Sequence, residues 1–85
     1  MITIKFTKNA AEDIEFWKKK DYKIFNRLKT IIKDICRDPY QGIGKPEPLK
    51  YSLSVQWSRR LTTEHRIVYE VKEEIIIIYQ CRFHY

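Results

Sequence analysis

The sequence predicts an α+β domain in which two helices pack on one face of an antiparallel sheet, in the order β-α-α-β-β-β. Three observations lead to this prediction. Apolar and polar residues alternate near the N-terminus and again after residue 52, a pattern typical of strands. Between these segments, apolar residues recur every three or four positions, as in amphipathic helices. The last three predicted strands are joined by turns too short for crossover helices, so they form an antiparallel meander.

A single domain covering residues 1–85 fits the chain length, which allows one modest core. A hydrophobic content of 44% and an aromatic content of 14% favour a folded globule over disorder. The longest apolar run, Ile75 to Tyr79, is far shorter than the ~20 residues that a membrane-spanning helix needs. The N-terminus lacks the apolar stretch of a signal peptide, and both cysteines are expected to be buried, reduced thiols. We therefore expect a cytoplasmic protein that does not enter a membrane.

The first strand and the first helix are predicted from the opening twenty residues. Apolar and polar side chains alternate over residues 2–6, which indicates a short strand. Thr7 or Asn9 is expected to cap a helix that extends to about residue 20. Glu12 and Asp13 are expected in the first turn of this helix and three lysines in its last turn, an arrangement that the helix dipole favours.

A second, longer helix is predicted to follow, with Asp21 as its cap. Its apolar stripe is formed by Ile24, Leu28, Ile31, Ile32 and Ile35. This helix ends at Asp38, because the following Pro39 disfavours helical geometry in the residue before it.

The segment from Asp38 to Pro48 is the one long irregular stretch of the chain and holds all three prolines and both glycines. Loops of this length inside small domains are more often functional than idle. Strands are predicted after it near residues 53–61, 65–72 and 74–83. Two helices cover only one face of the sheet, so we expect the other face to be open to a ligand.

The last predicted strand leads directly into the end of the chain. Tyr79, Cys81 and Phe83 are expected on its core face, and Gln80, Arg82 and His84 on the opposite face. The strand would hold the imidazole of His84 at a fixed place on the surface. Histidine is the side chain whose unperturbed pKa lies between pH 5 and 8, so this placement suggests an acid–base group.

The net charge of +6 and the pI of about 9.4 suit a polyanionic partner, although solubility alone would also explain them. The two histidines, His65 and His84, are not at metal-ligand spacing, and no carboxylate cluster indicates a magnesium site. Both cysteines lie at apolar positions, where a thiol is inert. We therefore expect no metal and no cofactor.

Three remaining residue types suit the metal-free cleavage of RNA by its own 2′-hydroxyl. Glu47 is presented between two prolines, whose fixed φ angles restrict the loop. Arg66 and Val68 lie on one side of their strand, and the more apolar side is the other one. Arg66 is therefore expected to share the open face with Arg82 and His84. A carboxylate, a guanidinium and an imidazole supply a base, an electrostatic stabiliser and an acid. The alternative, surface residues without a common task, stays open at this point.

Four ordered motifs then indicate a family. They are GIGKPEPLK at 42–50, WSRR at 57–60, EHRIVY at 64–69 and CRFHY at 81–85. Together they resemble the YoeB toxins, ribosome-dependent messenger-RNA endonucleases of the RelE-like toxin superfamily. The resemblance covers essentially the whole chain and implies cleavage of mRNA in the ribosomal A site. One departure is Phe83, where a tyrosine is common.

The resemblance also implies a role for each matching residue. Glu47 would be the general base for the 2′-hydroxyl, Arg66 would stabilise the pentacovalent phosphate, and His84 would protonate the leaving 5′-oxygen. Tyr85 would help to place the RNA. Further contacts to RNA or the ribosome are expected from four cations, namely Lys50, Arg59, Arg60 and Arg82.

The family further implies a homodimer and a YefM-type antitoxin whose C-terminal segment wraps the toxin. The complex of such a pair commonly binds operator DNA and represses its own operon. Two other classes of function remain: a RelE-fold interaction toxin of the gyrase-poison type without nuclease activity, and a basic RNA-binding module. His65, which lies on the apolar side of its strand, is interpreted as structural, and Trp17 and Trp57 as core or interface anchors.

Overall fold

The computed structural model describes residues 2–49 and 55–83. Its elements are β1 (Thr3–Phe6), α1 (Lys8–Lys20), α2 (Tyr22–Arg37), β2 (Glu47–Pro48), β3 (Gln56–Arg60), β4 (Arg66–Lys72) and β5 (Ile75–Gln80). The predicted order is confirmed, with the two-residue strand β2 added inside the predicted loop. The predictions for Lys50, His84 and Tyr85 lie outside the described residues.

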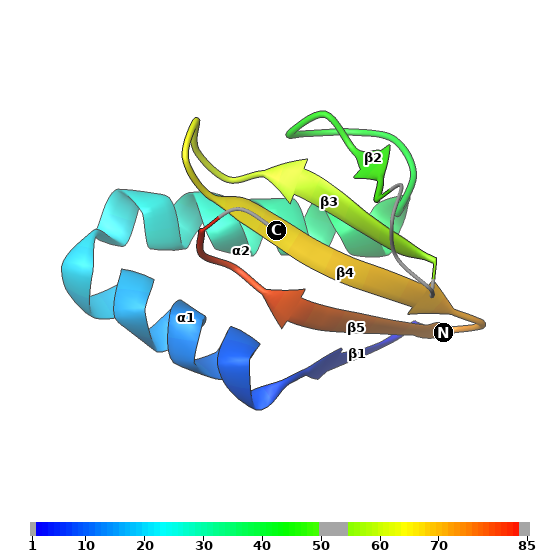
Figure 1. Ribbon diagram of the computed structural model, residues 1–85, viewed down its shortest axis with the longest axis horizontal. Coiled ribbons are helices and arrows are strands. Elements are labelled where there is room, and N and C mark those ends of the chain that lie inside the picture. The colour runs from blue at the N-terminus through cyan, green and yellow to red at the C-terminus, as the bar shows by residue number, and fades with distance from the viewer. Residues whose placement is uncertain (1, 50–54, 84–85) are drawn as a thin grey trace.

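The strands form one sheet in the order β1-β5-β4-β3-β2 (Figure 1). Strands β3, β4 and β5 form the predicted antiparallel meander, and β2 pairs antiparallel with β3. Strand β1 pairs parallel with β5, so the sheet is mixed and antiparallel only in its larger part. A parallel pair needs a long crossover connection, and the two helices after β1 carry the chain across one face of the sheet.

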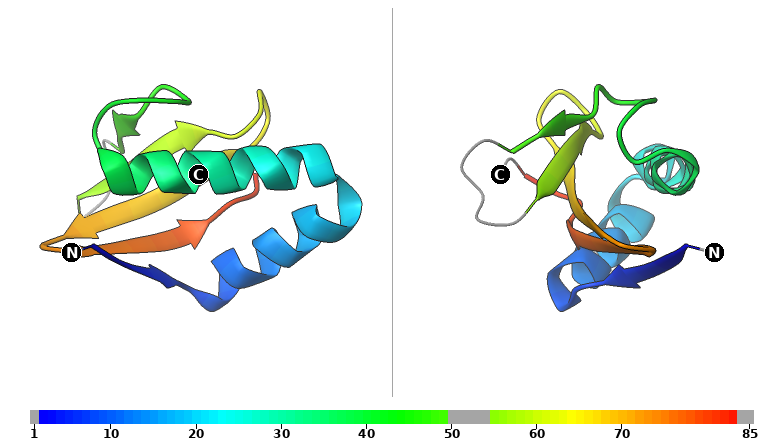
Figure 2. Two further views of the ribbon diagram at one scale, coloured as in Figure 1. Left: turned by 180° about the vertical axis from the view of Figure 1, so that it is seen from behind. Right: turned by 90° about the vertical axis from the view of Figure 1, so that its right-hand side faces the viewer.

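Both helices lie on one side of the sheet, as Figure 2 shows. Leu28, Ile31 and Ile35 of α2 are fully buried in one cluster with the core-facing residues of the sheet, among them Ile67, Tyr69, Ile76 and Ile78. The predicted apolar stripe of the second helix and the predicted core face of β4 are therefore confirmed. The core occupies the space between the helices and one face of the sheet, which leaves the other face uncovered by helices.

The helix starts follow from local capping. The Thr7 hydroxyl accepts a hydrogen bond from the Ala10 N–H at 3.1 Å, and Asp21 caps α2 by accepting bonds from the N–H groups at its start. Because α1 begins at Lys8, its first turn contains no acidic residue, and the expected acidic first turn is wrong. Asp13 is instead buried, and its carboxylate accepts a hydrogen bond from the Cys81 N–H at 3.0 Å.

The last strand is shorter than predicted. It ends at Gln80, and the chain bends over residues 81–83. A register shift pairs Val68 with Gln80 but Tyr69 with Ile78, so Tyr79 is an extra residue that changes the alternation of faces. Cys81 is buried as expected, whereas Phe83 is 58% exposed and does not anchor the strand in the core.

Arg59 is fully buried, which corrects the prediction that it contacts RNA or the ribosome. Its guanidinium donates to the Asp34 carboxylate of α2, to the Tyr69 hydroxyl of β4 and to three loop carbonyls, those of Asp38, Gln41 and Ile43. The guanidinium therefore ties the loop after α2 to both the helix and the sheet. A buried charge of this kind is tolerated because its donors are paired.

The loop around Arg59 requires a glycine at position 42. Gly42 has a φ of 138°, and a Cβ there would lie 1.9 Å from the carboxylate oxygen of Asp34. Hydrogen bonds from Arg37 and Arg59 hold the pKa of Asp34 well below its usual value of 3.8. A lowered pKa means that this stabilisation is present above pH 3.8 and is lost as the pH falls toward the folded-state pKa.

We expect Arg59→Met to destabilise the protein by about 3 kcal/mol or more. The substitution leaves the Asp34 carboxylate and the loop carbonyls without their buried donor. Urea unfolding monitored by tryptophan fluorescence measures the loss. The matched control is Arg60→Met at the exposed neighbouring position, which should change the free energy of unfolding by no more than about 0.5 kcal/mol. Equal effects at the two positions would show that the buried network does not hold the loop.

Candidate active site

Glu47 and Arg66, predicted as base and phosphate stabiliser, are in contact. The Arg66 Nη1 lies 3.0 Å from the Glu47 Oε1, across three strands of the sheet. Strand register explains this meeting, because Glu47 of β2 is opposite Ser58 of β3, which is opposite Val68 of β4. Residues in register share a face, and Val68 has the parity of Arg66, so both charged side chains belong to the face away from the helices.

Two backbone hydrogen bonds fix the strand that carries Glu47. The Arg60 N–H donates to the Gly44 carbonyl at 2.7 Å, and the Leu49 N–H donates to the Gln56 carbonyl at 2.9 Å. These bonds bracket β2 on either side of the carboxylate. Pro48 is tolerated because β2 is an edge strand. Glu47 therefore has a fixed backbone, while its side chain remains 50% exposed to a substrate.

Arg60 is the second cation of this face. It is exposed and lies directly opposite Arg66 in the β3–β4 register. Like charges directly opposite one another destabilise a sheet, and the Glu47 carboxylate beside Arg66 offsets part of this repulsion. Two guanidiniums at one place suit the binding of a phosphate, which accepts bidentate hydrogen bonds from arginine.

The end of the described chain also reaches Arg66. The backbone N–H of Arg66 donates to the carbonyl of Phe83 at 3.0 Å. That carbonyl belongs to the peptide bond that leads to residue 84. Arg66 therefore contacts Glu47 through its side chain and the backbone of Phe83 through its own N–H.

Arg82 does not lie on this face. Its guanidinium stacks on the Phe16 ring of α1, with 3.5 Å from Cζ to the ring centroid, and lies 4.4 Å from the Phe83 ring. The expectation that Arg82 shares the open face with Arg66 is wrong, because the chain bends after Gln80 and turns this side chain toward α1.

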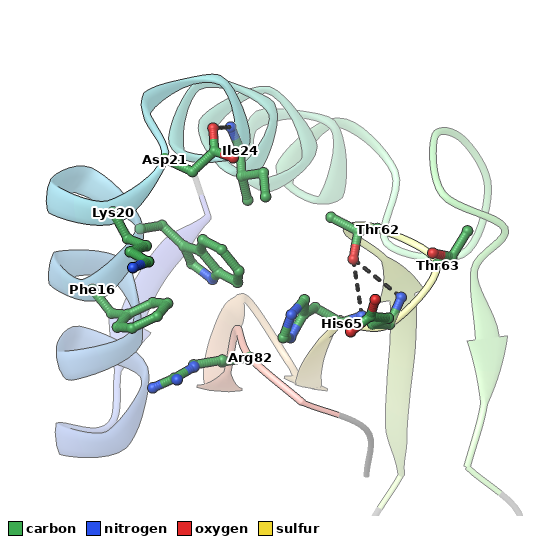
Figure 3. A pocket seen from close by; sticks show the side chains of 10 residues that line it. Phe16, Lys20, Asp21, Ile24, Thr62, Thr63, His65 and Arg82 are labelled. Atoms are coloured by element: carbon green, nitrogen blue, oxygen red, sulfur yellow. Dashed lines mark hydrogen bonds between the residues drawn. The ribbon is translucent and has the colours of Figure 1, made fainter.

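A pocket of about 460 Å³ adjoins Arg82. It lies between the end of α1, the start of α2 and the β3–β4 connection, as Figure 3 shows. Phe16, Lys20 and Arg82 are among the residues on one side, and His65 and Thr62 among those on the other. Thr62 accepts hydrogen bonds from the backbone N–H groups of Glu64 and His65, which shapes the connection before β4.

Three residues that hold the chain end were missed as functional candidates. They are Asp13 and Trp17 of α1, which bond to Cys81, and His65, which bonds to Phe83. The spacing of Asp13 and Trp17, four residues apart on a helix, puts both side chains on one face. The sequence signal that could have identified this pair is an acidic residue, Asp13, on an apolar face of the helix. His65, interpreted as structural from the sequence, packs against the rings of Trp17 and Phe83.

Within residues 2–49 and 55–83, no His, Cys, Asp and Glu side chains gather in a group of three that would hold a metal ion. Neither helix of the described chain is long and apolar enough to cross a membrane.

The chain is similar to known toxins over its whole length. Residues 6–85 match the family model of the YoeB-like toxin of bacterial type II toxin–antitoxin systems. The toxin YoeB of Synechocystis sp. is 48% identical over 82 residues, covering 96% of this chain and 95% of that protein. The YoeB dimer of Staphylococcus aureus superposes with a TM-score of 0.91 and 39% identity, covering 99% and 98% of the two chains. The YoeB–YefM complex of the same organism gives 0.87 and 37%, covering 100% and 99%.

Two helices on one face of a mixed sheet, with paired charges on the other, define a protein of the RelE-like toxin fold. The family model matches nearly the entire chain, and relatives are close to half identical in sequence, so the family within this fold can also be stated. The chain belongs to the YoeB-like toxins of bacterial type II toxin–antitoxin systems.

We expect Glu47→Gln to leave the stability nearly unchanged. The Glu47 carboxylate is half exposed, and exposed ion pairs contribute at most about 1 kcal/mol. Urea unfolding measures the free-energy difference, with Glu12→Gln on the exposed surface of α1 as the control. A loss above about 2 kcal/mol would mean that the Glu47–Arg66 pair is required for the fold, and this variant could not then report on chemistry alone.

Proposed function

We propose that this toxin is a ribosome-dependent endoribonuclease that cleaves messenger RNA in the ribosomal A site and so inhibits translation. The observation that carries the proposal is the contact between Glu47 and Arg66 at 3.0 Å on the sheet face opposite the helices. An interaction toxin of the gyrase-poison type, or a simple RNA-binding module, needs no carboxylate held beside an arginine. The YoeB-like family supports the same choice.

The reaction requires no metal. Glu47 accepts the proton of the ribose 2′-hydroxyl, and the 2′-oxygen forms a bond to the adjacent phosphorus. The bond from phosphorus to the 5′-oxygen breaks, and His84 gives that oxygen its proton. The products are a 2′,3′-cyclic phosphate, which can open to a 3′-phosphate, and a 5′-hydroxyl.

Arg66 stabilises the charge that develops on the phosphate in the transition state. Its Nη1 donates to the Glu47 carboxylate, which holds the guanidinium beside the proposed base. Arg60 and Lys50 add phosphate or ribosome contacts, and Tyr85 helps to place the RNA. The charge of +6 supports binding to the polyanionic ribosome and mRNA through long-range attraction.

We also propose three partners beyond the ribosome. A YefM-type antitoxin is supported by the YoeB–YefM complex of Staphylococcus aureus, and a second copy of the chain by the YoeB dimer. The toxin–antitoxin complex would bind operator DNA, as is common for such pairs. Because ribosomes are its target, the toxin acts in the cytoplasm.

Cleavage should depend on the ribose 2′-hydroxyl. A message with a single 2′-deoxy substitution at the scissile nucleotide should resist cutting there in a reconstituted translation reaction, because the attacking oxygen is absent. Primer extension locates the cut, and the same message with 2′-deoxy substitution several codons away is the control. Normal cleavage of the substituted site would exclude internal attack.

Removing either proton-transfer group should slow the cut while leaving ribosome binding intact. His84→Gln and Glu47→Gln should each lower the single-turnover rate by about 10² to 10⁴ fold, the range expected for a general acid or base. Glu73→Gln, in the hairpin between β4 and β5, is the control and should cut at the parental rate. Parental cleavage by His84→Gln would assign the acid to another group.

A further inference from the structure

The backbone of residues 81–83 is held mainly by side chains, together with one backbone hydrogen bond from Arg66 to Phe83. Strand β5 ends at Gln80, so the next three residues have no regular strand partner. Asp13, Trp17 and His65 supply hydrogen bonds to this segment, and we call these three side chains the clamp. The clamp lies immediately before the chain end that carries His84.

The part of the clamp on α1 fixes Cys81. Asp13 accepts from the Cys81 N–H at 3.0 Å, and the Trp17 indole donates to the Cys81 carbonyl at 2.8 Å. All three residues are buried, so both backbone groups of Cys81 are satisfied away from water. Desolvation, followed by the nearby Asp13 charge, raises the pKa of the Cys81 thiol to about 12, so this sulfur stays protonated.

The part of the clamp on the sheet fixes Phe83. The Phe83 N–H donates to His65 Nδ1 at 2.8 Å, and the Phe83 carbonyl accepts from the Arg66 N–H at 3.0 Å. Phe83 has a φ of 65°, which costs a non-glycine residue energy and needs support from its surroundings. His65 and Arg66 give this support at both backbone groups.

The Trp17 ring sets the orientation of the His65 ring. The two rings meet edge-on, with 4.8 Å between centroids and 78° between planes. Trp17 is itself held by Cys81, so the two halves of the clamp are joined through this contact. The ring is thereby held with Nδ1 at the Phe83 N–H, which donates to it.

We propose that His65 is a positioning residue for RNA cleavage: its Nδ1 fixes the backbone of Phe83, the residue that precedes the proposed acid His84 in the sequence. The inference rests on the proposed function of His84 as the acid. It adds a second role to the EHR segment, in which Arg66 would bind the phosphate and His65 holds the backbone of Phe83. A small displacement of a catalytic group, about 1 Å, can cost a factor of about 10² in rate.

A pair of variants separates the hydrogen bond from the packing of the ring. His65→Phe keeps an aromatic ring against Trp17 and removes the acceptor. His65→Asn loses the ring but keeps an acceptor on Cγ, where His65 carries Nδ1. If His65 acts by position, the single-turnover rate at saturating ribosomes should fall about 10- to 100-fold in His65→Phe and recover largely in His65→Asn. The concentration of toxin for half-maximal rate should not change in either variant.

Stability should follow the opposite order, because ring packing is retained in His65→Phe and lost in His65→Asn. Thr63→Ala, in the exposed connection before β4, is the control and should leave both rate and stability unchanged. A rate that declines in step with the free energy of unfolding would reduce His65 to a structural residue and overturn the proposal.

Hydrogen exchange of the Phe83 amide, measured by NMR on the isolated toxin, tests the clamp independently of catalysis. The amide should exchange faster in His65→Phe than in the parental protein and His65→Asn. Equal exchange in the parental protein and His65→Phe would overturn the clamp. If the parental toxin failed to cut mRNA on ribosomes while the amide behaved as expected, the proposed function alone would fail. The hydrogen bond from the Phe83 N–H to His65 would stand, and the role of His65 in cleavage would be lost.

Discussion

The buried guanidinium of Arg59 is the interaction on which the rest of the structure depends. Its donors reach α2, β4 and three carbonyls of the loop between α2 and β2. An irregular loop has backbone groups that need partners, and Arg59 supplies several of them from one side chain. The loop is thereby held along the edge of the sheet, and Glu47 emerges from it in register with β3.

This constraint separates the duties of two neighbouring arginines. Alternation along β3 turns Arg59 into the core and Arg60 to the open face, where it meets Arg66 in register. One cation therefore stabilises the fold and the next is available to a phosphate. The same division recurs in β4, where His65 at its entry holds the chain end and Arg66 contacts Glu47. In each pair of adjacent residues, the first stabilises the structure, and the second, on the opposite face, belongs to the candidate site.

The candidate site joins an edge strand to a central strand, and the backbone of Phe83 bonds to that central strand. Glu47 is held by ladder hydrogen bonds and Arg66 by the middle of the sheet, whereas residues 81–83 are held by side chains from α1 and by the β4 entry. Side-chain anchorage permits a sharp departure from the strand, which a continued ladder would not allow. The bend also turns Arg82 against Phe16, away from the open face.

The sequence by itself determined the order of the main elements, the cap Asp21, and the core stripes of α2 and β4, and it narrowed the cap of α1 to Thr7 or Asn9. These features depend on local periodicity and on contacts a few residues apart. It also singled out Glu47 and Arg66. Only the tertiary structure decided the burial of Arg59, the bulge at Tyr79, the parallel pairing of β1 and the clamp on residues 81–83. Each of these depends on partners far away in the chain, and alternation alone cannot register an extra residue or a side chain that replaces a strand partner.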